Sequence, residues 1–505
     1  MTNVRKSGSR WLHRLKIGAI ILCILLGADL ILDAIKWPFT KNATLSSLEK
    51  VSGCRVEIGA FHKTLFPHPG YLAYGVVFTR KNADGAVTLA TIKKLHCRAS
   101  WFALLSLTHR ISRFDLDGLT VTIPKHVPPP VHGPSKATIP TTVTDLYASG
   151  AVLQIAARSA GSQLERFDFP QLHLSNLARN KAVHVQLRIL DPRLIGRADV
   201  TGSVGPLNFN AVGKMPIAGE FRLSNLDLAA YKEVAGTVFA SGRFEGQVQS
   251  THVQGRATIP NFQVVRSQHS QGLAAEFRAL VNGIHGNVAI ESAAVHFLSS
   301  TLLAHGSISG KQAKTVTLEV DGQHAAIQDL LRLFVRGEPS PMTGGLAMHA
   351  HIELPPGTET FLKRVHISGD FKINDGLFSQ STTEEKVDEL SARAMGRKRD
   401  IAGTPVAVQM GSRVDLRDEI ATLSDAFFAV PGAIARGGGT YNLHNEAIDL
   451  DGKLAMHASL SQAATGVKSI LAIPLDPFFK KQGAGAVVPV RMTGTYVHPK
   501  FKMKL

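Results

Sequence analysis

Few residues of this 505-residue chain combine the types and spacing that chemistry requires. His349 and His351 alternate along one predicted strand, and a zinc ion would accept both if a cysteine or carboxylate joined them. No HExxH or CxxC motif exists, so we interpret the pair as histidines on the solvated face of a strand. Asp449 and Asp451 share this spacing, and nothing around them indicates the burial that shifts a catalytic pKa.

Motifs for phosphate binding and nucleophilic catalysis are also missing from the sequence. Gly437, Gly438 and Gly439 are not followed by the Lys-Ser/Thr pair of a phosphate-binding loop, and no G-x-S-x-G sequence occurs. We interpret the glycine triplet as a bend or bulge between strands. The sequence therefore predicts a protein that is not an enzyme and has neither metal nor cofactor.

Three cysteines are too few for a disulfide framework. Cys23 lies inside an apolar run, and Leu22 precedes it where lipidation signals have a small residue. Cys54 and Cys97 would have the chance to pair in an oxidising compartment, but the sequence does not fix their geometry. Their pairing stays open.

The net charge of +17 is spread along the chain, without a zinc-finger, RNP or basic-heptad pattern, so we expect no nucleic-acid partner. A basic surface suits anionic lipid headgroups, at about 1 kcal/mol for each Lys or Arg, or is simply solvated. Charged residues make up 19% of the chain, below the roughly 25% of soluble domains. The mean hydropathy of +0.05 is high for one long apolar run, so apolar surface must be accommodated elsewhere as well.

Residues 17–36 form that apolar run, which is long enough, at 1.5 Å per residue, to cross a hydrocarbon core of about 30 Å. Five basic residues and no acidic one come before it, so the positive-inside rule places the N-terminus in the cytoplasm. A cleaved signal peptide would begin in the same way, but no A-x-A-like site follows, and we expect an uncleaved anchor. The expected anchor residues are Ile17, Ile20, Ile24, Leu26, Leu30 and Trp37.

Beyond Thr44, which we expect to cap a short helix, apolar and polar residues alternate with a period of two. This pattern is typical of antiparallel strands with unlike faces, and a slip of one residue would invert every face. The apolar positions of the clearest runs are Val183, Val185, Leu187, Ile189, Val316, Leu318, Val320, Leu346, Met348, Ile352, Leu454 and Met456.

Turn and helix signals interrupt the strands. Asp-Gly or Asn-Gly pairs at positions 117, 282, 321, 375 and 451 suit hairpins or bulges. Short helices are predicted near Trp101 and over 326–334, 383–394 and 461–473. The Pro-rich stretch 127–142 is a predicted linker or loop. It separates a basic stub (1–16), the membrane helix (17–36) and a β region (37–126) from a repetitive β region (143–505).

Four segments resemble the AsmA family of bacterial envelope proteins. They are the start of the chain with LSSLEKVSGCRVEIG (45–59), a strand, helix and strand-Asp-Gly-strand block (91–125), a helix followed by Pro, Thr-Gly and a new strand (327–354), and the ending (438–460 and 473–501). The ending closes on G-T-x-x-x-P-x-F, from Gly494 to Phe501. Together these segments span most of the chain.

The resemblance implies an inner-membrane protein whose body lies in the periplasm and forms an elongated antiparallel β-sheet curled into an open groove of stacked β-units, with a few short helices. It also implies that the alternating apolar positions line this groove and bind lipid, notably phospholipid passing toward an outer membrane. An open apolar trough would expose more contiguous apolar area than a soluble monomer does, unless acyl chains cover it. Each buried methylene contributes about 0.8 kcal/mol.

Other functions stay open beside this one. A structural or assembly factor would guide outer-membrane proteins along exposed sheet edges, with envelope proteins as partners. An exported enzyme and an unrelated anchored β protein are further alternatives. Continuous apolar positions along one face favour lipid, and short polar-lined edges favour a client strand.

Overall fold

The computed structural model describes residues 39–82, 85–102, 110–123, 142–155, 165–177, 181–191, 194–207, 211–231, 233–310, 314–396, 405–459, 480–481, 484–495 and 499–503. Of these residues 70% are in strands, which confirms the mainly β prediction. The chain divides into two compact units, Met1–Val183 and His184–Leu505. The predicted anchor lies outside the described residues, and no helix among those described is long and apolar enough to cross a membrane.

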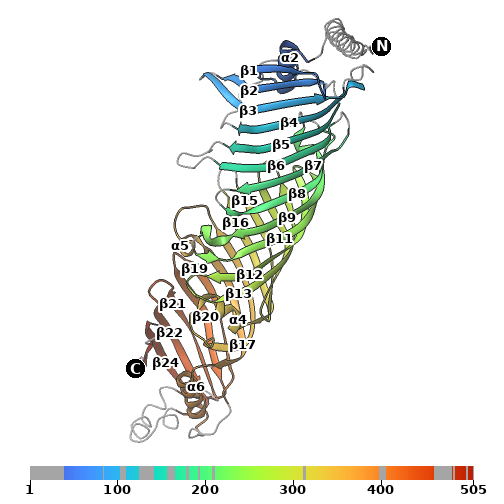
Figure 1. The fold of residues 1–505 in the computed structure, drawn as a ribbon. Coiled ribbons are helices and arrows are strands. Elements are labelled where there is room, and N and C mark those ends of the chain that lie inside the picture. The colour runs from blue at the N-terminus through green and yellow to red at the C-terminus, as the bar shows by residue number, and fades with distance from the viewer. Residues whose placement is uncertain are drawn as a thin grey trace, which may run out of the picture. The chain divides into compact units, whose positions relative to one another are not determined.

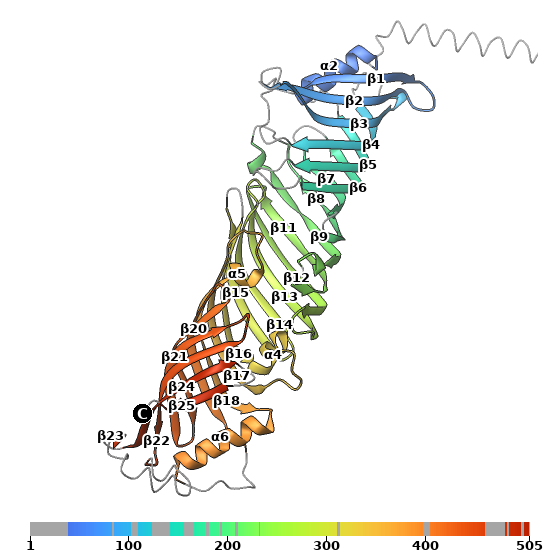
Figure 2. The ribbon, with the colours of Figure 1, turned by 90° about the vertical axis from the view of Figure 1, so that its left-hand side faces the viewer.

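The first unit begins with helix α2 (Lys41–Ser52), which lies against the first strands of the sheet (Figure 2). Thr40 caps this helix, because its hydroxyl accepts a hydrogen bond from the amide of Ala43 at 3.3 Å. The expectation that Thr44 is the cap was therefore wrong by one turn. Thr44 is buried inside the helix, and its side chain bonds Tyr71 instead.

The strands of the first unit pair in chain order. They are β1 (Arg55–Thr64), β2 (Gly70–Asn82), β3 (Gly85–Ala99), β4 (Arg110–Ile123), β5 (Thr142–Ile155) and β6 (Glu165–Leu177). All these pairings are antiparallel except β4 with β5, which is parallel. The prediction of an antiparallel sheet is thus wrong at this pair. The predicted linker 127–142 falls almost wholly outside the described residues, between two strands that pair with each other within one unit.

The second unit continues the antiparallel pattern from β8 to β25 (Figure 1). Its longer strands are β7 (Val183–Asp191), β8 (Leu194–Val204), β9 (Pro216–Asp227), β11 (Thr237–Gln247), β12 (Ser250–Val264), β13 (Ser270–Asn282), β14 (Asn287–Phe297), β15 (Ser300–Ser309), β16 (Thr315–Ala326), β17 (Met342–Leu354), β18 (His366–Phe378), β19 (Val408–Arg417), β20 (Ile420–Val430), β21 (Ala433–Asn442), β22 (Ala447–Met456) and β24 (Ala484–Thr495). The shorter strands are β10 (Val234–Ala235), β23 (Lys480–Lys481) and β25 (Pro499–Met503).

Two of the predicted helices are present in the second unit. Helix α4 (Ile327–Phe334) and helix α6 (Ser381–Ala394) confirm the amphipathic patterns at 326–334 and 383–394. A short helix, α5 (Phe361–Arg364), and the 3-10 turns η1 (Val212–Lys214) and η2 (Leu228–Tyr231) were not predicted. The predicted helix at 461–473 and most of the segment near Trp101 lie outside the described residues.

The five predicted turn pairs have different outcomes. Asn282-Gly283 forms the β13–β14 hairpin, whereas the Gly322 and Gly376 pairs lie at register shifts inside β16 and β18. Gly118 has a φ of +62° within β4. Gly452 lies inside β22 with regular pairing, opposite Gly437, so no turn or bulge forms there. The glycine triplet that starts at Gly437 likewise belongs to strand β21, and the register shift lies in its partner β20.

The sheet of the second unit curves back on itself. Nη1 of Arg266, in the β12–β13 turn, donates to the carbonyl oxygen of Leu443, in the β21–β22 turn, at 3.1 Å. In a flat sheet, nine steps of ~4.8 Å would separate these turns by about 43 Å. The backbone amide of Phe361 in α5 likewise donates to Oε1 of Glu233, just before β10, at 2.9 Å. We refer to these two links as the rim contacts.

Candidate functional site

One face of the curved sheet in the second unit is apolar across many strands, and we call it the apolar face. Residues directly opposite each other on paired strands point to the same side. Starting from Leu318, such pairing connects β14 to β22. The residues of this Leu318 row are Ile290, Gly306, Leu318, Ile352, Ile367, Leu416, Ala421, Tyr441 and Ile448.

A second row continues the apolar face toward β8. The residues of this Phe221 row are Val200, Phe221, Gly242, Gly255, Phe277, Ala293, Ala304, Val320 and Ala350. Its glycines make room for the rings, because an added Cβ on Gly242 would lie 2.8 Å from Cε1 of Phe221 and one on Gly255 would lie 3.1 Å from Cζ of Phe277. The aromatic rings therefore cover exposed backbone and keep the face apolar.

Most of the sequence-predicted groove residues lie half-buried, and three of them, Met348, Ile352 and Leu454, pack against closed core clusters. The half-buried set comprises Val185, Leu187, Ile189, Val316, Leu318, Val320, Met348, Ile352 and Leu454. Register places Leu318 opposite Ile352, and Val320 opposite Ala350. The structure thus brings the positions of β16 and β17 together on one face, in line with the alternation of the sequence.

Three of the predicted groove residues have a different environment. Val183, the first residue of β7, is 1% exposed and is the last residue of the first unit, whose boundary lies inside this strand. Leu346 and Met456, 3% and 7% exposed, belong to a core cluster that also contains Ile327 of α4 and Val387 of α6. The two helices cover that part of the apolar face. Leu346 and Met456 therefore contribute to a closed core rather than to an uncovered surface.

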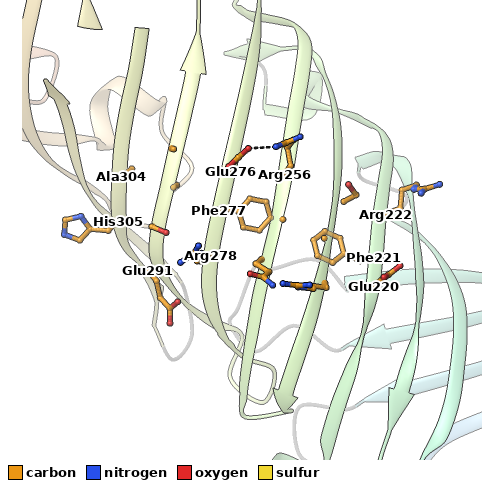
Figure 3. Close-up of a pocket in the computed structure, with 18 of the residues that line it drawn as sticks. Glu220, Phe221, Arg222, Arg256, Glu276, Phe277, Arg278, Glu291, Ala304 and His305 are labelled. Carbon is orange, nitrogen blue, oxygen red and sulfur yellow. Dashed lines mark hydrogen bonds and ion pairs between the residues drawn. The ribbon is translucent and has the colours of Figure 1, made fainter. Parts of the chain in front are cut away.

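The opposite face is charged, and we call it the polar face. A shallow hollow on β8 to β16 is lined by charged side chains, including Arg222, Arg256 and Glu276, and also by Phe221 and Phe277 of the Phe221 row (Figure 3). Arg256 pairs with Glu276 across the strands. Asp199 binds Nε of both Arg188 and Arg197 at 2.8 Å, and the hydrogen bond from Arg188 is the main cause that lowers the pKa of the Asp199 carboxyl. Such exposed pairs align neighbouring strands and contribute little stability.

The two histidines point to solvent on this polar face, as predicted. Nδ1 of His349 lies 2.7 Å from Oδ1 of Asp321, and Nδ1 of His351 lies 2.5 Å from Oε1 of Glu319. The hydrogen bond with Asp321 raises the pKa of His349. Among the described residues, no group of three or more His, Cys, Asp or Glu side chains is arranged to hold a metal ion.

The carboxylates of Asp449 and Asp451 are solvated on the polar face too, with side chains 51% and 52% exposed. Arg491 lies 2.8 Å from Asp449 and 3.9 Å from Asp451. Their environment therefore agrees with the surface interpretation of the pair.

Cys54 and Cys97 are free thiols buried in the core of the first unit, together with Val76 and Tyr71. Burial raises the pKa of the Cys97 thiol, which also contacts the Tyr71 hydroxyl. Since burial opposes ionisation, these thiols have the character of core residues and not of nucleophiles.

Sequence reasoning missed one buried polar group beside the apolar face. Asp329 of α4 is 6% exposed, and its Oδ2 accepts hydrogen bonds from the amide and hydroxyl of Ser299 and from the hydroxyl of Ser300, at 2.7–2.9 Å. The hydroxyl of Ser300 also accepts from the amide of Ala326 at 2.9 Å. This network attaches α4 to the β14–β15 turn. An aspartate in the first turn of an apolar helix is the one signal that the sequence offers for it.

The chain was also compared with known proteins. No family model, no curated protein and no solved structure matches it.

Proposed function

We propose that the protein binds lipid acyl chains along the apolar face of its second unit, while the N-terminal segment anchors it in the inner membrane. The observation that carries this proposal is the unbroken cross-strand pairing of the Leu318 row and the Phe221 row, on a face where most side chains are half-buried. Leu416 and Ala421 are the part of the Leu318 row that a core cluster with Val365 covers. A run of about ten methylenes laid on such a face gains about 8 kcal/mol, so no specific polar contact is required. Phospholipid in transit toward an outer membrane, as in AsmA-like proteins, is the ligand that we favour.

This role requires binding and not catalysis. Lipid would lie along the rows, so the row residues of neighbouring strands would contact successive parts of one acyl chain. The rim contacts favour retention, because they hold the two rims of the curved sheet together at one level. The polar face supplies the solvated exterior that an exported body requires.

The alternative function as an assembly factor depends on accessible sheet edges. The edge strand β25 is only five residues long, begins at Pro499 and carries Lys500 and Lys502. Short length, proline and lysine are features that keep an edge strand from pairing with another chain. This edge therefore favours the lipid proposal over the guidance of a client strand.

The test is crosslinking of the full chain with a phospholipid that carries a photoreactive group in its acyl chain, followed by peptide mapping. Leu318→Asp places a charge on the apolar face, and Thr317→Asp is the matched control one residue away on the other face. We expect crosslinks on β14 to β20 in the unmodified chain and in Thr317→Asp, and their loss in Leu318→Asp with an unchanged circular dichroism spectrum. An unmodified chain without crosslinks, or equal crosslinking of both variants, would contradict the proposal.

A further inference from the structure

The first unit exposes large apolar side chains at one end of its sheet. Phe66 is 90% exposed, Phe102 is 80% exposed and Leu65 is 40% exposed. We call Leu65, Phe66, Trp101 and Phe102 the aromatic patch.

Hydrogen bonds join the two segments that carry the aromatic patch. Nε1 of Trp101 donates to the carbonyl oxygen of Pro67 at 3.2 Å, and the backbone amide of Ala99 donates to the carbonyl oxygen of Pro69 at 2.7 Å. The loop after β1 and the segment after β3 therefore lie side by side. The solvent exposure of Phe66 and Phe102 is thus a feature of a built surface and not of two separate loops.

The chain enters the unit at the same end of the sheet. The ring of Phe39 packs on Tyr71 with centroids 6.1 Å apart, and Phe61 stacks on the same ring at 5.2 Å. Tyr71 follows Gly70, the residue that pairs with Thr64 at the base of the loop carrying Phe66. Figure 2 shows α2 beside β1 and β2, which brings the start of the helix back toward this loop.

The length of chain before Phe39 limits the distance of this end from a membrane. The predicted membrane helix ends at residue 36, and three extended residues span at most about 11 Å. Phe39 would therefore lie within the headgroup region or directly above it. Aromatic side chains are enriched at that depth because they present an apolar body to the acyl chains and tolerate the polar boundary.

Charge around the aromatic patch fits the same partner. Lys63 is exposed next to the patch, and Asp84 is the only acidic residue between Glu57 and Asp115. Lysines and arginines are numerous over the same stretch. Arg98 is paired with Asp115 at 2.5 Å, so Lys63 is the exposed basic residue beside the patch. A surface that combines aromatic residues with positive charge matches an anionic lipid interface.

We infer that the aromatic patch of the first unit inserts into the lipid interface of the membrane that holds the anchor, as a second membrane contact of the protein. This inference depends on the anchor of the proposed function but not on lipid binding by the second unit. Insertion at two points would fix the orientation of the first unit on the membrane, whereas a single helix would leave it free to tilt.

The test uses single-tryptophan variants of the full chain in vesicles of phosphatidylcholine and phosphatidylglycerol whose acyl chains are brominated near the headgroup. All three native tryptophans are replaced by phenylalanine, and Phe66→Trp or Phe102→Trp is introduced. Ile284→Trp, in the exposed β13–β14 turn, is the matched control. A fourth variant retains Trp37 as its only tryptophan and reports on the anchor.

We expect Phe66→Trp and Phe102→Trp to lose about half of their fluorescence relative to unbrominated vesicles, as for groups 5–10 Å inside the interface. The emission of Ile284→Trp should not change. Quenching at Trp37 without quenching at Phe66→Trp would overturn the inference and leave the anchor standing. Absence of quenching at Trp37 and at Phe66→Trp would overturn both, and neither outcome bears on crosslinking at Leu318.

Discussion

Replacing Asp329 by alanine should release helix α4 from the sheet. The carboxylate accepts three hydrogen bonds from Ser299 and Ser300 while being 6% exposed. Hydrogen bonds to a charged acceptor contribute roughly 1.5–3 kcal/mol each. The desolvation of a buried carboxylate offsets part of their sum, so we expect a net loss of about 3 kcal/mol.

Hydrogen exchange measured by mass spectrometry checks this expectation locally. A loss of about 3 kcal/mol corresponds to a roughly 100-fold increase in the opening of the peptide that covers 327–335. Asp329→Asn retains an acceptor oxygen and should give a smaller increase. Asp321→Ala, which removes an exposed carboxylate of the adjacent strand, is the control and should change exchange of this peptide little. Unchanged exchange of the α4 peptide in Asp329→Ala would refute the reasoning.

Three further predictions concern other parts of the chain. The raised pKa of His349 means that its contact with Asp321 stabilises the fold at low pH, and that this contribution is lost as pH rises through the folded pKa. An NMR titration of His349 should show a midpoint above 6.5 that falls in Asp321→Asn. An unshifted midpoint would contradict this expectation. Cys97 should resist alkylation in the native protein and react once urea unfolds it, and fast native labelling would argue against its burial. Leu346→Ala should reduce the free energy of unfolding by about 3 kcal/mol and Leu318→Ala by about 1 kcal/mol; equal losses in denaturant titrations would mean that the apolar face is covered throughout.

Alternation of residue types revealed the strands because the two faces of the sheet have different surroundings. In β16, Val316, Leu318 and Val320 share one side, as the sequence predicts, and the partner positions Ile352 and Leu354 follow from the register. The helices α4 and α6 were recognised because an apolar stripe with a helical period differs from strand alternation. These are local properties, and local properties can be read along the chain.

Properties that depend on distant segments could not be read in this way. Leu318 and Leu346 have the same alternating context, yet only Leu346 is covered, because α4 and α6 pack over its end of the sheet. Alternation also does not indicate the relative direction of two paired strands, so the parallel pairing of β4 with β5 could not be predicted from it. The contact of Arg266 with a backbone carbonyl at Leu443 leaves no trace in either segment.

The rim contacts have a consequence for folding. Where each strand touches only its neighbours, a sheet is stabilised almost like a one-dimensional array, and its ends can open while the middle remains intact. The link between Glu233 and Phe361 and that between Arg266 and Leu443 connect segments 128 and 177 residues apart. We expect the strands between them to gain and lose their structure together. This part of the chain should unfold as one cooperative block, whereas β8, which precedes it, should open independently.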